Sequence, residues 1–322
     1  MLLTIILSLA VTGVMAEDGL FEYRFADAAE AAELLLSNRG YYENMSQNDL
    51  NFRMQKLDAT LAELESFAAQ QTMDFTGEEK AAIDEAMRLI ESVCAERGYS
   101  LPPTDGIVFA KTTMAEECGA GAYTHGTQIY LGASLLQYGA SGLPMFRDVF
   151  NRTVIHEVFH CLTRNHPDFR EAMYGILGFT VVEKDYDFPQ EIRDRIISNP
   201  DVERHNSYAS FDINGEKKNC AVIFTTSQPF EKPGDSFFSG MVTGLVPVGD
   251  LSVMYTAEDA ANFWDVFGRN TDYVIDPEET LADNFSYTIL YGPDSARFPT
   301  PSILREIDRC LREGFAGEAD AA

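Results

Sequence analysis

Basic residues are scarce in this 322-residue sequence. Lysine and arginine together number 24 against 51 aspartates and glutamates, so the formal net charge is −27. A surface this acidic repels phosphate backbones and anionic lipid head groups, which argues against nucleic acid and membrane surfaces as partners. Histidine is equally rare, and any chemistry that requires imidazole depends on five residues: His125, His156, His160, His166 and His205.

Long apolar segments are absent beyond the first residues of the sequence. Residues 2–14 are almost continuously apolar and lead into Met15-Ala16. About 13 apolar residues fall short of the roughly 20 that cross a bilayer. A short apolar segment that ends in small residues is typical of a secretory signal peptide. We therefore predict a signal peptide over residues 1–16, a mature chain without a membrane span, and a secreted or periplasmic location.

Cysteine is also infrequent, and no pair has the C-x-x-C spacing. This gives little support to a cysteine zinc site or to a redox motif. In an oxidising compartment one or two disulfides are expected. We favour Cys94 with Cys118 as a local pair and Cys220 with Cys310 as a second pair, which leaves Cys161 free and buried.

Helical patterns dominate residues 17–104, which we interpret as a helical N-terminal region. Apolar residues recur at helical spacing over residues 47–71, which predicts one helix there. Thr76 and Glu79 form a capping box, the sequence pattern that begins a helix, and predict a second helix that runs toward Arg97.

The sequence after this region alternates between strand and helix patterns. Strands are predicted over residues 105–113 and 127–131, with a glycine-rich link over residues 118–122 between them. A strongly apolar helix follows over residues 145–163 and ends before His166-Pro167, because the residue before proline avoids helical geometry.

Residues 207–255 form a β-rich segment. Asn214-Gly215 suits a tight turn between strands over residues 208–213 and 220–226, and two more short strands are expected over residues 241–253. Helical patterns return at the end of the sequence. They start at Pro277 and at residue 302, and an acidic, alanine-rich tail over residues 316–322 is predicted to be disordered. These elements predict an α+β fold.

The most informative motif is H-E-x-x-H, formed by His156, Glu157 and His160 in the apolar helix. Residues four apart share one helix face, so the two imidazoles can bind one metal ion. Zinc accepts nitrogen and oxygen ligands and keeps one position for water in catalytic sites. Glu157 can take a proton from that water and deliver it to a leaving amine. Uncompensated histidines in so apolar a helix would be costly, and a metal removes that cost.

Two histidines need at least one further ligand, and two candidates compete. His166 has the outer spacing of the longer H-E-x-x-H-x-x-G-x-x-H pattern, but Thr163 stands where that pattern has glycine. Glu279 and Asp283 form E-x-x-x-D on a predicted helix and also share one face. There Glu279 could bind the metal, while Asp283 accepts the free ring N–H of a ligating histidine.

Together, the H-E-x-x-H motif, the E-x-x-x-D motif and the β-rich segment between them resemble the gluzincin branch of the zincin metallopeptidases. Residues 269–279 and 282–285 also resemble those of bacterial exported zinc metallopeptidases whose activity is uncharacterised. The resemblance extends over residues 105–311, and only the two zinc motifs are specific. It implies that residues 127–131 form the edge strand that lines the cleft in zincins.

The resemblance implies a fold and a set of site residues. The fold is a zincin-like domain over residues 105–315, with a small mixed sheet over the central H-E-x-x-H helix and a β-rich insertion before a C-terminal helical part. Zinc is bound by His156, His160 and Glu279, with Glu157 as the general base and Asp283 as the partner of a ligating histidine.

In gluzincins a tyrosine or histidine also stabilises the oxyanion. Tyr208 is our candidate and His205 the alternative, because both lie in the corresponding stretch. The expected function is an exported zinc-dependent hydrolase that cleaves peptide bonds in peptide or protein substrates. Two alternatives stay open: a non-catalytic exported binding protein on a zincin fold, and a peptidase with His166 instead of Glu279 as third ligand. The oligomeric state is left undetermined.

Overall fold

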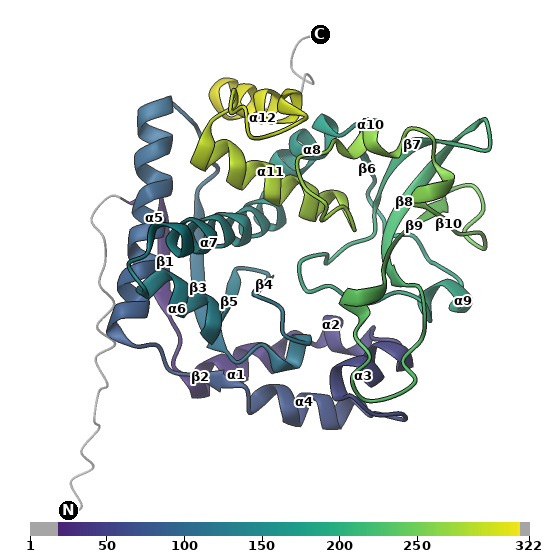
Figure 1. The fold of residues 1–322 in the computed structure, drawn as a ribbon, viewed down its shortest axis with the longest axis horizontal. Helices are drawn as coiled ribbons and strands as arrows, with labels where there is room; N and C mark the ends of the chain where they lie inside the picture. The colour runs from purple at the N-terminus through teal and green to yellow at the C-terminus, as the bar shows by residue number, and fades with distance from the viewer. Residues whose placement is uncertain (1–18, 316–322) are drawn as a thin grey trace, which may run out of the picture.

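The computed structural model describes residues 19–315, and within this range it is a mixed α+β protein with two β-sheets (Figure 1). This confirms the predicted fold class. The predicted signal peptide over residues 1–16 and the predicted disordered tail over residues 316–322 lie outside the described residues. Among the helices of residues 19–315, none combines the length and the apolar character that a membrane span needs.

The first sheet contains the strands that precede the H-E-x-x-H helix. Its main strands run in the order β1-β3-β5-β4, and β2 pairs antiparallel with β3. β1 and β5 are parallel to β3, whereas β4 is antiparallel to β5 and lies at an edge of the described sheet. The bounds are β1 (Phe21–Phe25), β2 (Thr72–Met73), β3 (Thr104–Thr112), β4 (Ala122–His125) and β5 (Gln128–Gly132).

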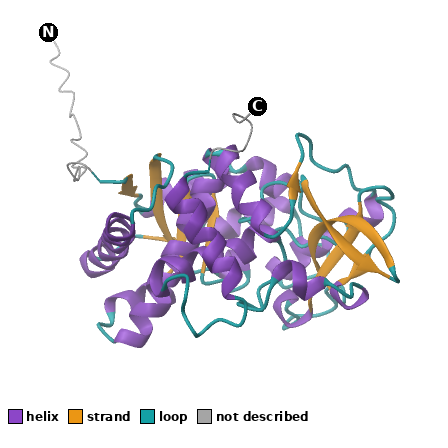
Figure 2. Ribbon diagram, turned by 90° about the horizontal axis from the view of Figure 1, so that it is seen from above, coloured by secondary structure: helices purple, strands orange, loops and turns teal. Residues whose placement is uncertain are grey.

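The second sheet is antiparallel and lies at one end of the molecule, away from the first sheet (Figure 2). Its order is β10-β9-β8-β7-β6. The predicted hairpin is confirmed: Asn214 and Gly215 connect two strands with φ of 54° and 81°, the left-handed values that a tight turn requires. The bounds are β6 (Thr180–Val181), β7 (Ser207–Ile213), β8 (Glu216–Thr226), β9 (Met241–Pro247) and β10 (Tyr255–Thr256).

Twelve α-helices and three short 3₁₀ helices surround and separate the sheets within the described residues. The α-helices before the motif are α1 (Ala28–Ser37), α2 (Arg39–Glu43), α3 (Gln47–Met54), α4 (Leu61–Ala69), α5 (Gly77–Arg97) and α6 (Ala133–Ala140). Those that carry or follow it are α7 (Pro144–Asn165), α8 (Pro167–Ile176), α9 (Gln190–Arg193), α10 (Phe263–Phe267), α11 (Pro277–Tyr291) and α12 (Pro301–Glu313). The 3₁₀ helices are η1 (Ala115–Glu117), η2 (Phe237–Gly240) and η3 (Ala257–Asp259).

The core is built around α7, which contacts β3 and β5 of the first sheet as well as α5, α6, α8 and α11. This packing mostly buries the part of α7 from Phe150 to Thr163, whereas most of residues 144–149 are exposed. Phe159 of α7 and Phe285 of α11 are fully buried, and their ring centroids lie 5.3 Å apart. The two helices that carry the predicted zinc motifs are therefore held against each other by the hydrophobic core.

Several predicted elements are confirmed, and others need correction. The capping box of Thr76 and Glu79 does begin α5. The single helix expected over residues 47–71 is wrong: it is split into α3 and α4, because Gln55 and Asp58 adopt left-handed backbone geometry with φ of 52° and 54°. Apolar spacing alone did not reveal this break, since the stripe continues on both sides of it.

Several short strands were missed, among them β1 and β4 of the first sheet. β1 lies within the region expected to be helical, and it pairs with β3. β4 begins at the last residue of the predicted glycine-rich link. The resemblance implied that residues 127–131 form the edge strand, but β5 lies between β3 and β4, so the edge is β4. The preference for β structure in such short segments comes from pairing with partners that are distant in sequence.

The expected disulfides do not form. All five cysteines lie within the described residues, and each is a free thiol. Cys94, on α5, packs into the main core, whereas Cys118 packs against a separate cluster that contains Phe52. Burial raises the pKa of the Cys94 thiol to about 11 and that of Cys118 to about 12, so both behave as small apolar side chains.

Candidate metal centre

The two motif histidines lie one turn apart on α7, with ring centroids 4.8 Å apart. The facing element is the first turn of α11. Asp276 caps this helix by accepting a hydrogen bond from the Glu278 N–H at 2.8 Å, and Pro277 fits the first helical position. Local sequence therefore begins a helix at the point where Glu279 can face α7.

His156, His160 and Glu279 offer ligand atoms that all lie within 4.8 Å of one another. Glu279 Oε2 is 3.0 Å from His156 Nε2 and 3.7 Å from His160 Nε2. His160 is completely buried, and its Nε2 has no hydrogen-bond partner among the described residues. A buried unpaired nitrogen is costly, and a bound cation would remove that cost. Two imidazole nitrogens and a carboxylate oxygen are a donor set that zinc accepts, so these residues fit a metal.

Each histidine also has a carboxylate partner on its other ring nitrogen. Asp283 Oδ1 lies 3.1 Å from His156 Nδ1, and Glu278 Oε1 lies 3.0 Å from His160 Nδ1. An ionised carboxylate only accepts hydrogen bonds, so the Nδ1 atoms donate and each Nε2 is left to face the centre. The structure thus places Asp283 as the sequence predicted, and adds Glu278, which sequence reasoning missed.

Charge and burial act in opposite directions on these groups. Burial alone would lower the pKa of His156, but its hydrogen bonds with Asp283 and Glu279 raise this pKa well above 6.5. Burial alone would raise the carboxylate pKa values, yet His156 holds those of Glu279 and Asp283 below their ordinary range. Without metal the site therefore keeps a proton on His156 and negative charge on its partners.

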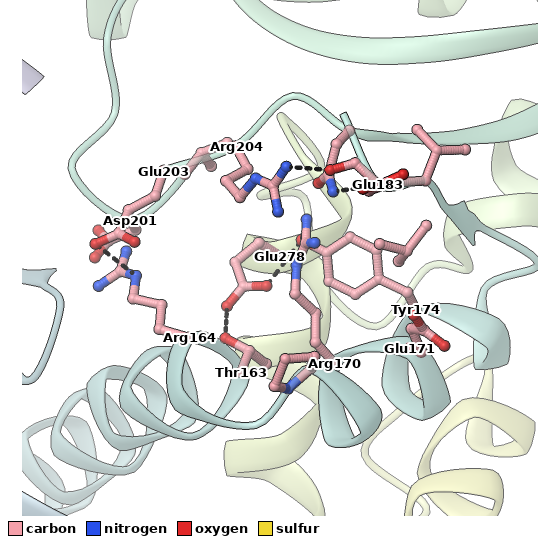
Figure 3. Close-up of a pocket in the computed structure, with 15 residues that line it drawn as sticks. Thr163, Arg164, Arg170, Glu171, Tyr174, Glu183, Asp201, Glu203, Arg204 and Glu278 are labelled. Atoms are coloured by element: carbon pink, nitrogen blue, oxygen red, sulfur yellow. Dashed lines mark hydrogen bonds and ion pairs between the residues drawn. The ribbon is translucent and has the colours of Figure 1, made fainter. Parts of the chain in front are cut away.

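Glu278 also lines a cavity of about 420 Å³, whose other walls come from the end of α7, from α8 and from residues 181–206. Its Oε1 also accepts a hydrogen bond from the Thr163 hydroxyl, and its Oε2 accepts one from the Tyr174 hydroxyl at 2.8 Å. Figure 3 shows Glu278 between these two hydroxyls. Arg170 stacks over the Tyr174 ring at 4.4 Å. This network fixes the carboxylate that orients His160.

Glu278→Gln is expected to lower zinc affinity by about 10- to 100-fold, the usual effect of losing such an outer partner. A glutamine has one acceptor oxygen for the three donors and adds an N–H₂ that meets one of them. The measurement is chelator competition on the purified full chain. Glu171→Gln, at an exposed glutamate of α8 on the rim of the same cavity, is the control. Equal zinc affinity for Glu278→Gln and wild type would contradict the orienting role.

Glu157 lies beside the three candidate ligands and is buried. The Thr124 hydroxyl, on edge strand β4, donates a hydrogen bond to Glu157 Oε2 at 2.8 Å. The Thr124 backbone N–H donates to Asp201 Oδ1 at 2.7 Å. Burial raises the pKa of Glu157, although the nearby histidines lower it in part. Burial and the charge of Glu157 raise the pKa of Asp201 well above its usual range.

A second cavity, of about 290 Å³, opens directly onto His156, Glu157 and Glu279. Tyr273, just before α11, also lines it, and sequence reasoning did not identify this residue. Burial and the charge of Glu279 raise the pKa of Tyr273 well above its ordinary value, which keeps its hydroxyl protonated. A protonated phenol beside the cavity can donate a hydrogen bond.

Three other candidates from the sequence do not reach the centre. His166 contacts the Pro103 carbonyl through Nε2 at 2.8 Å and belongs to neither of the metal-capable groups among the described residues, so this structure does not place it beside the other candidate ligands. Tyr208 lies on the less buried face of β7 and does not line the cavity. His205 is also absent from the lining of that cavity, and its ring packs against Phe188 with centroids 5.8 Å apart.

The structure therefore does not place Tyr208, the oxyanion candidate from the sequence, beside the metal centre. β7 belongs to the second sheet, and the alternation of this strand buries Ser207, Ala209 and Phe211 while Tyr208 points to the opposite face. No local motif marks Tyr208, and its place in the sequence between the two zinc motifs was the sole basis for the prediction.

Comparisons with known proteins give no further information on this site. No protein-family model, no curated protein and no solved structure matches the chain. The chemistry of the site is therefore argued from the arrangement of its own side chains.

Proposed function

We propose that this protein is a zinc-dependent peptidase with a gluzincin-type metal centre on a zincin-like fold. His156, His160 and Glu279 would bind the metal. The observation that carries the proposal is the convergence of one buried imidazole, one partly buried imidazole and a buried carboxylate beside the buried Glu157, from helices more than 100 residues apart in sequence. The antiparallel edge strand β4, which contacts Glu157 through Thr124, supports the finer fold assignment.

Zinc, when bound, supplies Lewis acidity to the site. The protein supplies proton transfer: Glu157 accepts a proton from the attacking water and delivers it to the leaving amine. Its raised pKa, a consequence of burial, brings it closer to the range where it can both accept and release a proton near neutral pH. The Thr124 hydroxyl holds the carboxylate in place at 2.8 Å.

Binding and charge stabilisation would come from the cavity next to the metal centre. The Ala122 end of β4, which lines the same cavity, could pair with an extended peptide backbone, whereas at Thr124 the edge is already hydrogen-bonded to Asp201 and Arg164. The Tyr273 hydroxyl, which lines this cavity, would donate a hydrogen bond to the oxygen that gains negative charge. We therefore propose Tyr273 in the role that the sequence assigned to Tyr208.

The proposed location and substrate class rest on the sequence. The segment over residues 1–16 supports export, and a peptide or protein substrate fits hydrolysis at an exported zinc centre. With a net charge of −27 and several carboxylates around the site, acidic peptides would be poor substrates. Hydrolysis of basic or neutral peptides is the expected activity.

The test combines metal analysis with a peptidase assay on the full chain. We expect one zinc per chain, hydrolysis of a mixed peptide library, loss of hydrolysis with a chelator and its return with zinc. A chain that binds zinc and cleaves no peptide would instead support a binding protein on the same fold. A chain that binds no metal would contradict the metal centre itself.

Zinc affinity should continue to rise with pH above neutrality. Protons and zinc compete for His156, and the metal-free pKa of this residue is raised well above 6.5 by Asp283 and Glu279. The conditional affinity should therefore fall as pH drops, by about tenfold per pH unit for each proton displaced. Chelator competition between pH 5.5 and about 8.5 measures this trend. Two imidazoles with ordinary pKa values would give a zinc affinity that stops rising near pH 7. Such a plateau would contradict the raised pKa of His156.

A further inference from the structure

We infer that Asp201 is a fourth protein ligand of the metal, supplied by the segment of residues 197–206 between α9 and β7. This inference rests on the proposed function, because it concerns the same metal. It goes beyond the two zinc motifs, since no sequence pattern marks Asp201 and it lies about 40 residues from either histidine.

The position of the carboxylate is the first argument. Asp201 Oδ1 lies 3.9 Å from His160 Nε2, and Glu279 Oε2 lies 3.7 Å from the same nitrogen. Ligand atoms around a tetrahedral zinc are about 3.3–3.5 Å apart, so the two carboxylates are nearly equivalent with respect to His160. Asp201, Glu157 and His160 form a second group of ligand atoms within 4.8 Å of one another. Both groups contain His160, and one ring nitrogen binds one metal ion. The two groups therefore describe the surroundings of a single metal ion.

The burial of Asp201 is the second argument. The residue is 6% exposed, and within residues 19–315 the only basic side chain at ion-pair distance from it is His160. Arg164 is near, but it donates to the Thr124 and Pro200 carbonyls and pairs with Glu203. A buried carboxylate without a cation is unfavourable. The cation that the unpaired His160 Nε2 also requires would serve both groups.

The hydrogen bonds of this segment arrange it for that contact. The Asn199 side-chain amide donates to Glu279 Oε1, and Asn199 Oδ1 accepts the backbone N–H of Asp201 at 3.0 Å. One asparagine therefore ties the two carboxylates together. Thr124 holds Asp201 Oδ1 from the side of β4. Figure 3 shows Asp201 close to Arg164 at the edge of the 420 Å³ cavity, and Asp201 also lines the 290 Å³ cavity that opens onto His156 and Glu279.

Two consequences follow for the metal centre. The donor set becomes two imidazole nitrogens and two carboxylate oxygens, so the attacking water of the proposed function would take a fifth position, an expansion that catalytic zinc accepts. The metal also becomes a link between α7, α11 and segment 197–206, so the order of this segment depends on the metal. A metal held by the two motifs alone would reach this segment only through the hydrogen bond from Asn199 to Glu279.

The test uses cobalt(II) as the probe on the full chain, with Asp201→Asn, Asp201→Ala and the control Glu203→Gln. Glu203 lies two residues further in the same segment, and its side chain is largely exposed. We expect both Asp201 variants to lose cobalt affinity by about tenfold or more and to change the visible cobalt absorption. Glu203→Gln should keep both properties of the wild type. Asp201→Asn preserves shape and an acceptor for Thr124, so a folding defect in Asp201→Ala alone does not decide the result.

Hydrogen exchange separates a ligand from a mere neighbour. Metal should slow amide exchange in residues 197–206 of the wild type and of Glu203→Gln, but not of Asp201→Ala. Wild-type affinity, absorption and metal-dependent exchange in both Asp201 variants would overturn the inference while leaving the three-ligand centre in place. A wild-type chain that binds no cobalt would overturn the inference and the proposed function together.

Discussion

Glu157→Gln is expected to reduce peptide hydrolysis by about 10²- to 10⁴-fold, the usual contribution of a general base, while the chain retains its zinc. Glutamine has nearly the shape of glutamate, so it can keep the hydrogen bond from Thr124. It cannot accept and return a proton. The ligand atoms of His156, His160 and Glu279 are untouched by the change, so metal content should remain at the wild-type level.

The measurement pairs turnover with metal content in the same preparation. Glu171→Gln is the matched control, because it makes the same chemical change on an exposed part of α8. It should keep both zinc and activity. Ordinary turnover by Glu157→Gln on a peptide that the wild type cleaves would contradict the assignment of the base. Loss of zinc together with activity would show that Glu157 helps to bind the metal.

Elements with a strong local signal could be predicted from the sequence. The capping box of α5, the Asn214-Gly215 hairpin and the apolar helix α7 all depend on neighbours a few residues away. β1 and β4 could not be predicted in this way. Each contains five residues or fewer, and pairing with β3 or β5 determines its state. The break between α3 and α4 depends on two residues with left-handed geometry that apolar spacing does not reveal.

The residues of the metal centre show the same difference between local and long-range signals. His156 with His160, and Glu279 with Asp283, are pairs four residues apart on one helix, so the sequence could predict both faces. Their meeting depends on the packing of α7 against α11. Thr124, Asp201 and Tyr273 each come from a different strand or loop and carry no motif. Only the folded chain brings them to the same site, and the prediction for Tyr208 had no local motif to support it either.

The identity of the third ligand gives the second large effect. Glu279→Ala is expected to lower zinc affinity by more than about 100-fold. It removes a metal ligand, and this loss costs more affinity than the loss of an outer hydrogen-bond partner. It also leaves the His156 Nε2 without its 3.0 Å contact and removes the acceptor of Asn199. Zinc should therefore be lost on dialysis against a weak chelator, and peptide hydrolysis should be lost with it.

His166→Ala is the matched comparison, since it removes the rival ligand. His166 is half-buried at the end of α7 and contacts the Pro103 carbonyl at 2.8 Å and the Thr104 hydroxyl at 3.3 Å. Its loss should cost only about 0.5–1.5 kcal/mol of stability, the usual net value of a hydrogen bond, with zinc and activity unchanged. The opposite pattern, zinc kept by Glu279→Ala and lost by His166→Ala, would require the end of α7 to turn back toward the metal. That turn would break the contacts of His166 with Pro103 and Thr104 and would separate α11 from the centre, so metal content in this pair of variants decides between the two ligand sets.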